Sequence, residues 1–135
     1  MTDLVKILKY AKKTKALLRK GWCQKTLAQS IKKRAVKVSS PRACSFCILG
    51  AIRRACTQTS YEYALRDYVG QVLSERYEWG HERCGWGRTD SNFFVGFNDA
   101  SSTTKKMVLD VLTSTISLLE ERIKNDYLSK DKLCV

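Results

Sequence analysis

Three types of side chain that together can perform nucleophilic catalysis occur in this chain. A cysteine thiolate, a histidine base and a group that orients the base form such an arrangement. The candidates are Cys47, His81 and either Asn98 or Asp99. A helix N-terminus near Cys47 would lower the pKa of its thiol. However, His81 is the only histidine, and cysteine is often buried for packing alone. A small cysteine-dependent enzyme is therefore a hypothesis, and a non-enzymatic protein is favoured over it.

Two residue pairs have the spacing of zinc ligands. Cys44 and Cys47 form a Cys-x-x-Cys pair, and His81 and Cys84 form a His-x-x-Cys pair. Together they would supply the four N and S ligands of a structural zinc site. The first pair lies inside a segment that the sequence predicts as a helix, whereas ligand pairs often occupy turns. We therefore expect Cys47 to be a small core residue, and we expect no metal and no other cofactor.

The positive charge of the chain is concentrated in its first part. Residues 1–60 contain fifteen Lys and Arg and one acid, residues 61–135 contain ten Lys and Arg and twelve acids, and the net charge is +12. This excess is more than solubility requires, and it indicates a polyanionic partner. Lysines on a helix face and in a loop would contact phosphates. The candidate polyanion-binding residues are Lys6, Lys9, Lys12, Lys13, Lys20, Lys32, Lys33, Arg34, Lys37, Arg53 and Arg54.

These basic residues lead to two hypotheses about the partner. Lysine predominates, which favours contact with a phosphate backbone over base readout. The leading hypothesis is therefore a non-enzymatic protein that binds nucleic acid or a nucleoprotein machine. The alternative is an inhibitor that binds the acidic face of a host enzyme or defence protein. In that case Trp79, Trp86 and Arg88, in an irregular Gly-rich stretch, would be partner contacts.

Hydrophobic periodicity predicts the helices that position these residues. Predicted helices span residues 3–20 (with Thr2 as N-cap), 22–31, 41–56, 59–77 and about 103–124. Residues 32–40 are basic and aperiodic, which indicates a loop. Ser40 and Pro41 form a start signal for the third helix, and Thr59 with Glu62 fits a capping box. Gly50 inside the third helix costs about 1 kcal/mol relative to alanine, which indicates that another backbone approaches it closely.

Length and composition favour a mainly α, compact single domain. We expect about four to five helices within residues 1–124, a small β element near residues 92–97 and a polar tail over residues 125–135. No apolar run approaches the roughly 20 residues that span a bilayer. Lysines interrupt the apolar stretches of the N-terminus, so we expect no secretory signal and no membrane contact. Six cysteines without such a signal indicate reduced thiols in a cytoplasm, that of the host if the protein is phage-encoded.

Three short stretches, read together, resemble a known family. They are Gly-Trp-Cys-Gln at residues 21–24, Cys-Ile-Leu-Gly-Ala at residues 47–51 and Phe-Asn-Asp at residues 97–99. In this order the chain is similar to a family of small proteins of unknown function from actinobacteria and their phages. Phe46 and Phe97 stand where that family usually has tryptophan, and its linker is acidic where residues 32–40 are basic. The resemblance implies a compact, mainly helical domain and a phage or mobile-element origin, and it implies no activity.

Overall fold

The computed structural model of the protein describes residues 3–79 and 90–133, with side chains as far as residue 129. This part of the chain contains five helices and one two-stranded sheet, which confirms the mainly α fold. The elements in chain order are α1 (Leu4–Lys20), β1 (Ala28–Gln29), β2 (Ser45–Phe46), α2 (Ile48–Ala55), α3 (Thr59–Tyr77), α5 (Ser91–Asp99) and α6 (Lys105–Leu133). Four candidate site residues lie outside the described residues: His81, Cys84, Trp86 and Arg88.

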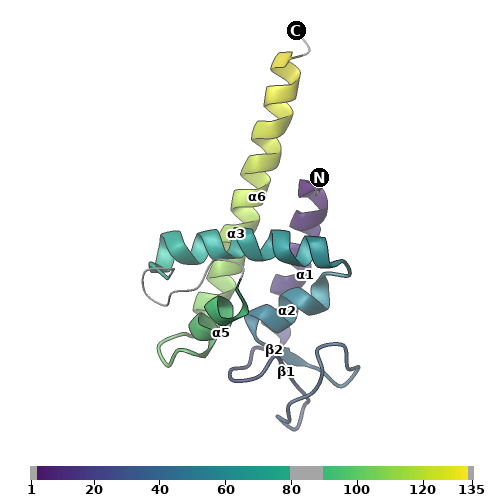
Figure 1. Cartoon of the computed structure of the whole chain (residues 1–135), viewed down its shortest axis with the longest axis vertical. Helices are drawn as coiled ribbons and strands as arrows, with labels where there is room; N and C mark the ends of the chain where they lie inside the picture. The colour runs from purple at the N-terminus through teal and green to yellow at the C-terminus, as the bar shows by residue number, and fades with distance from the viewer. Residues whose placement is uncertain (1–2, 80–89, 134–135) are drawn as a thin grey trace.

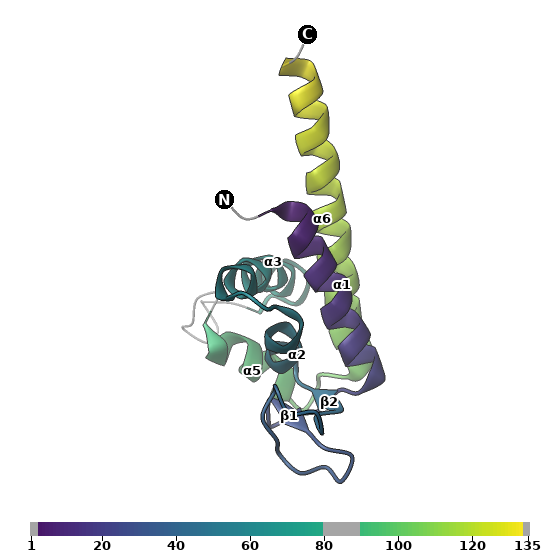
Figure 2. The same ribbon diagram turned by 90° about the vertical axis from the view of Figure 1, so that its right-hand side faces the viewer.

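The helices are arranged around a pair formed by the first and the last of them. α1 and α6 lie side by side and run in opposite directions, and α3 crosses them (Figures 1 and 2). α2 and α5 lie on the side of α3 that faces the sheet. The sheet and the loop between its strands form the end of the molecule opposite the C-terminus (Figure 1). Part of α6 extends beyond the other helices toward that C-terminus.

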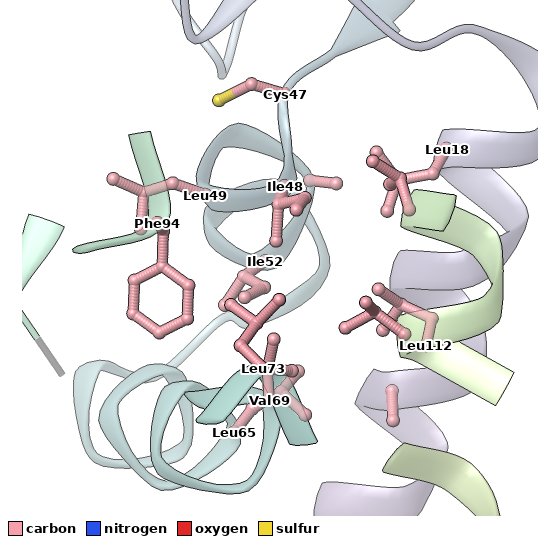
Figure 3. Packing of buried hydrophobic residues seen from close by; sticks show 14 of the residues in the cluster. Leu18, Cys47, Ile48, Leu49, Ile52, Leu65, Val69, Leu73, Phe94 and Leu112 are labelled. Carbon is pink, nitrogen blue, oxygen red and sulfur yellow. The ribbon is translucent and has the colours of Figure 1, made fainter. Parts of the chain in front are cut away.

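The hydrophobic core lies where α2 meets the other helices. Leu18 of α1 and Leu112 of α6 approach it from one side, Leu73 of α3 from below and Phe94 of α5 from the other side, around Ile52 (Figure 3). All five side chains are fully buried. Burying one such side chain contributes about 1.5–3 kcal/mol. The short α2 is therefore held by its neighbours rather than by its own helix propensity.

α1 forms much as the sequence predicts. Its buried stripe includes Ile7, Ala11 and Leu18, and Gly21 follows its last residue. The N-cap is Asp3 and not the predicted Thr2, because Asp3 Oδ1 accepts a hydrogen bond from the Val5 N–H at 2.9 Å. A carboxylate in this position satisfies a free N–H group and interacts favourably with the helix dipole.

The predicted helix over residues 22–31 is wrong, because this segment pairs with the strand that precedes α2. β1 and β2 are antiparallel, with Ala28 opposite Phe46 and Gln29 opposite Ser45. Trp22 also forms a parallel bridge to Phe46. Because of the same pairing, the third helix does not start at Pro41, as the sequence predicted. Residues 45 and 46 are extended, and α2 therefore begins only at Ile48.

The signals that predicted the other helix boundaries act differently in the structure. Ser40 Oγ accepts a hydrogen bond from the Arg42 N–H at 3.1 Å, so the Ser-Pro pair begins a turn and not a helix. α3 has the predicted bounds, but its N-cap is Gln58 and no side chain caps it. Glu62 does not close a capping box. Its Oε2 instead accepts a hydrogen bond from Arg66 Nη2 at 2.7 Å.

The C-terminal part of the chain is more helical than predicted. Residues 91–99 form α5 and not a β element. α6 ends at Leu133 and not near residue 124, so the expected tail is helical over residues 125–133. Residues 124–129 are exposed along this extension. Among the described residues, no helix has the length and apolar character that crossing a bilayer demands.

Candidate functional site

Asn98, near the end of α5, is a buried amide whose hydrogen-bonding groups are all occupied. Its Oδ1 accepts hydrogen bonds from Trp22 Nε1 at 2.8 Å and from the Ile48 N–H at 3.0 Å. Its Nδ2 donates to the Cys23 carbonyl and to Asp99 Oδ1, both at 3.0 Å. Because the side chain is 1% exposed, water does not compete for these bonds. Asn98 therefore joins α5, the segment after α1 and the first turn of α2.

Two neighbouring residues strengthen the same junction. Gln24 Nε2 donates to the carbonyl oxygens of Asn98 at 2.9 Å and of Ala100 at 3.2 Å. The Lys25 N–H donates to Asp99 Oδ1 at 2.8 Å, and Lys25 has a φ of 69°. Few residues other than glycine adopt this left-handed conformation. Asp99 thus helps to hold a strained turn, and both Asn98 and Asp99 have structural roles.

Two glycines allow backbones to meet at this junction. A Cβ on Gly50 would lie 2.0 Å from the Leu27 carbonyl oxygen, and a Cβ on Gly21 would lie 2.4 Å from the Cys44 carbonyl oxygen. The close backbone approach expected at Gly50 is confirmed. The Cys47 N–H donates to the same Leu27 oxygen at 3.1 Å, so this oxygen cannot move away without breaking a hydrogen bond.

Cys47 is the N-cap residue of α2 and is buried. Its Sγ accepts a hydrogen bond from the Gly50 N–H at 3.3 Å, and the residue is 3% exposed. Burial raises the pKa of the Cys47 thiol, and the helix N–H groups only reduce this effect. The expectation of a lowered pKa is therefore wrong, since loss of hydration outweighs the helix terminus. A cavity of about 220 Å³ adjoins Cys47, Leu27, Val95 and Asp99.

We expect the buried thiols to resist alkylation in the native protein. Burial raises the pKa of Cys23 to about 12 and that of Cys56 to about 11, from 9.0. At pH 8 the thiolate of Cys56 is then about 100-fold rarer than that of an ordinary thiol. Cys44 is exposed and should react with iodoacetamide before Cys23, Cys47 and Cys56, as peptide mass mapping would show. Preferential alkylation of Cys47 would instead revive the hypothesis of a cysteine-dependent enzyme.

The structure describes two of the four candidate zinc ligands, Cys44 and Cys47. Cys44 is exposed, whereas Cys47 points its sulfur at the first turn of α2. Among residues 3–79 and 90–129, no three His, Cys, Asp or Glu side chains are grouped so that they could hold a metal ion. The other two candidates, His81 and Cys84, lie outside the described residues.

A basic loop at the end of the molecule is the second candidate site. We use this name for residues 30–42, which connect β1 to β2 (Figure 1). The loop lines an open cavity of about 590 Å³, and three of the residues lining it are Lys32, Arg34 and Arg42. Lys32 and Arg34 were predicted from the sequence. Arg42 was missed because it lay in a predicted helix, although it follows a Ser-Pro turn signal.

The basic loop has a fixed conformation. The Ser30 N–H donates to the Arg34 carbonyl at 2.9 Å, and the Val36 N–H donates to the Ala28 carbonyl at 3.1 Å. Arg54 Nη1 donates to the Val38 carbonyl at 2.7 Å and to the Ser40 carbonyl at 3.0 Å. These bonds hold the backbone of the loop against α2, so the positions that carry the lining side chains are set before any ligand arrives.

The remaining candidate basic residues differ in what they contact. Arg54 is occupied by the basic loop, and Arg53 forms an ion pair with Glu62 at 3.8 Å. Lys6 lies over the Tyr61 ring, 5.6 Å from its centre. The other candidates are exposed on α1 or in the basic loop: Lys9, Lys12, Lys13, Lys20, Lys33 and Lys37. α1 ends near the sheet (Figure 2). Lys20 is the last residue of α1 and is therefore the α1 candidate that is nearest to the basic loop in sequence.

Trp79 is half-buried and packs against α5. Its Nε1 donates to the Phe93 carbonyl at 2.9 Å, and its ring meets Phe97 edge-on with centres 5.9 Å apart. The other two predicted partner contacts, Trp86 and Arg88, lie outside the described residues. The described part of the chain therefore offers no exposed tryptophan anchor of the kind that the inhibitor hypothesis needs.

The fold and the two candidate sites define a small, mainly α domain. A buried asparagine, Asn98, connects several of its elements, and a basic loop lies at one end. The model of a family of unknown function, DUF6197, matches residues 5–118, and the chain belongs to this family. The resemblance to a family of unknown function is thus confirmed. No curated protein and no solved structure gives a significant match to the chain. The matched range contains both the Asn98 junction and the basic loop.

Proposed function

We propose that the protein is a non-enzymatic nucleic-acid-binding protein that uses the basic loop as its main contact. The observation that supports this most strongly is the cavity lined by Lys32, Arg34 and Arg42 on a loop of fixed shape. Among the described residues, none forms an ion pair with these three side chains. Phosphates would supply the missing negative charge.

The exposed lysines of α1 would be a second contact. Lys9, Lys12 and Lys13 are exposed on one helix, and α1 descends toward the end of the molecule that carries the basic loop (Figure 2). A helix of this length, about 25 Å, would let a nucleic acid or nucleoprotein partner contact several lysines at once. Such contacts are with phosphates and carry little sequence information.

The Asn98 junction supports a binding role rather than catalysis. The residues that were candidates for an active site, Cys47, Asn98 and Asp99, are hydrogen-bonded to backbone groups that hold the fold together. The four described cysteines are free, which fits a reducing compartment such as the host cytoplasm. A phage or mobile-element origin belongs to the same proposal.

Titration of labelled DNA and RNA tests the proposed function. We expect the affinity of the wild-type protein to fall by about 10³-fold between 50 and 200 mM salt if about six phosphates are contacted. Changing Lys32, Lys33 and Lys37 to Gln should weaken binding and lower the slope of log affinity against log salt by about 2. All three are exposed, so the fold should remain intact, as circular dichroism would show.

A matched variant separates the two contacts. Changing Lys9, Lys12 and Lys13 to Gln removes the same charge from α1, and we expect a smaller loss of affinity than for the loop variant. Equal losses of affinity in the two variants would show that the total charge of the protein matters and the position of the lysines does not. No binding at 50 mM salt would contradict the proposal, and an acidic protein partner, sought by pull-down, would then replace nucleic acid.

A further inference from the structure

We infer that the basic loop takes single-stranded nucleic acid, with one unstacked base inside its cavity. This inference rests on the proposed function and adds the class of nucleic acid. It follows from the shape and the chemistry of the cavity, which differ from those of a surface that contacts phosphates alone.

Apolar and basic residues both line the cavity. Ile31, Ala35 and Val36 line it together with Lys32, Arg34 and Arg42. Its volume of about 590 Å³ falls within the range of small-molecule sites, about 300–1,000 Å³. A nucleotide has the matching composition, because its base is a flat ring with apolar faces and its phosphate is an anion.

Ile31 is the clearest sign that the cavity is incomplete without a ligand. This side chain is 87% exposed, more than any other large hydrophobic residue among those described. It lies in a turn that is fixed by the Lys33 N–H bond to the Ser30 carbonyl at 2.9 Å, and Lys33 has a φ of 60°. The loop thus keeps an isoleucine in water beside its cations, although water is the least favourable surrounding for that side chain.

A duplex would not use this arrangement. In a double helix the bases are stacked inside, and only phosphates and groove edges reach a loop. Phosphates would meet Lys32 and leave Ile31 and Val36 uncovered. In a single strand the bases can be splayed out, and proteins stack them on aromatic rings or on the planes of arginine guanidinium groups.

The roles of the lining residues follow from these facts. The guanidinium groups of Arg34 and Arg42 offer the planes for stacking, and Ile31 covers an apolar edge of the base. Lys32 receives the adjoining phosphate as a point charge. Stacking accepts every base, so we expect a preference for single strands with little preference for sequence.

Substitutions that keep the charge test the inference. Changing both Arg34 and Arg42 to Lys retains the net charge but removes the two stacking planes. We expect this variant to bind a labelled single-stranded 12-mer about 10-fold more weakly than the wild type, with unchanged affinity for a 12-base-pair duplex. The variant Ile31→Ser should act in the same direction, and since Ile31 is exposed it should not unfold the protein.

An abasic oligonucleotide provides the matched control on the ligand side. It keeps every phosphate of the single strand and lacks the bases, so wild-type protein should bind it about 10-fold more weakly than the intact strand. Equal affinity for intact and abasic strands, or for single strand and duplex in wild type and both variants, would overturn the inference and leave the proposed function standing. Absence of binding to every oligonucleotide at 50 mM salt would overturn both.

Discussion

Replacement of Asn98 by leucine is expected to lower the free energy of unfolding by about 4 kcal/mol. Leucine fills a similar volume but forms no hydrogen bond. It would leave the Trp22 Nε1–H, the Ile48 N–H and the Cys23 carbonyl without their present partner. Each buried group left unpaired costs about 1–3 kcal/mol. Since small domains are stable by only about 5–15 kcal/mol, this one side chain would account for a large share of the stability.

The same exchange elsewhere on α5 is the control. Asn92 is exposed, and only its backbone N–H takes part in the first turn of the helix, by donating to Asp90 Oδ1 at 2.8 Å. We expect Asn92→Leu to change stability by less than about 0.5 kcal/mol. Urea unfolding of both variants, followed by circular dichroism, gives the comparison. Equal stabilities would mean that the bonds of Asn98 do not hold the junction together.

Periodicity was a reliable guide where one helix face packs on the core. α1 and α3 were predicted with nearly their observed bounds because their buried residues recur at helical spacing, as Ile7, Ala11 and Leu18 do. The sequence of α5 contains the same helical spacing of buried residues, although a β element was predicted there. Phe93, Phe94, Phe97 and Asn98 are all buried, and their spacing is that of one helix face. The glycine and the aromatic residues of this short segment suggested a strand instead.

The segments before α2 could not be predicted from local signals. Residues 22–31 have helical character, but their backbone groups pair with β2 and with side chains of α5, which lie far away along the chain. α2 begins at Ile48, and Cys47 is its N-cap residue. The Cys47 sulfur accepts a hydrogen bond from the Gly50 N–H, and Asn98 Oδ1 accepts one from the Ile48 N–H. Cysteine is not among the usual N-cap residues, so only the tertiary structure reveals the start of this helix.

The sequence located the candidate site only in part for the same reason. Lys32 and Arg34 stood out by charge, but charge alone could not distinguish them from Arg54, which holds the loop in place. Arg42 lines the cavity because the chain turns at Ser40. The short motifs at residues 21–24, 47–51 and 97–99, which carry the resemblance to the family, meet in one structural junction. The basic loop, whose Lys32, Arg34 and Arg42 have exposed side chains, is the site on which the proposed function rests.

Gly50→Ala tests the packing at the Asn98 junction. In this variant, helix propensity and tertiary packing have opposite effects on the free energy of unfolding. Alanine in the interior of a helix is favoured over glycine by about 1 kcal/mol, so α2 taken alone would gain stability. The added Cβ would, however, lie 2.0 Å from the Leu27 carbonyl oxygen and 2.9 Å from its carbon. Both are backbone atoms, and the oxygen also accepts the Cys47 N–H.

We therefore expect Gly50→Ala to lower the free energy of unfolding by about 3 kcal/mol. Ser117→Ala, at an exposed position of α6, measures the propensity term alone and should raise stability by about 0.5 kcal/mol or less. A Gly50→Ala protein as stable as the wild type would mean that Leu27 moves aside at little cost. Because Leu27 precedes β1, such a shift would also displace the adjoining basic loop. Nucleic-acid binding by this variant would then show whether the glycine holds the loop in position as well as the fold.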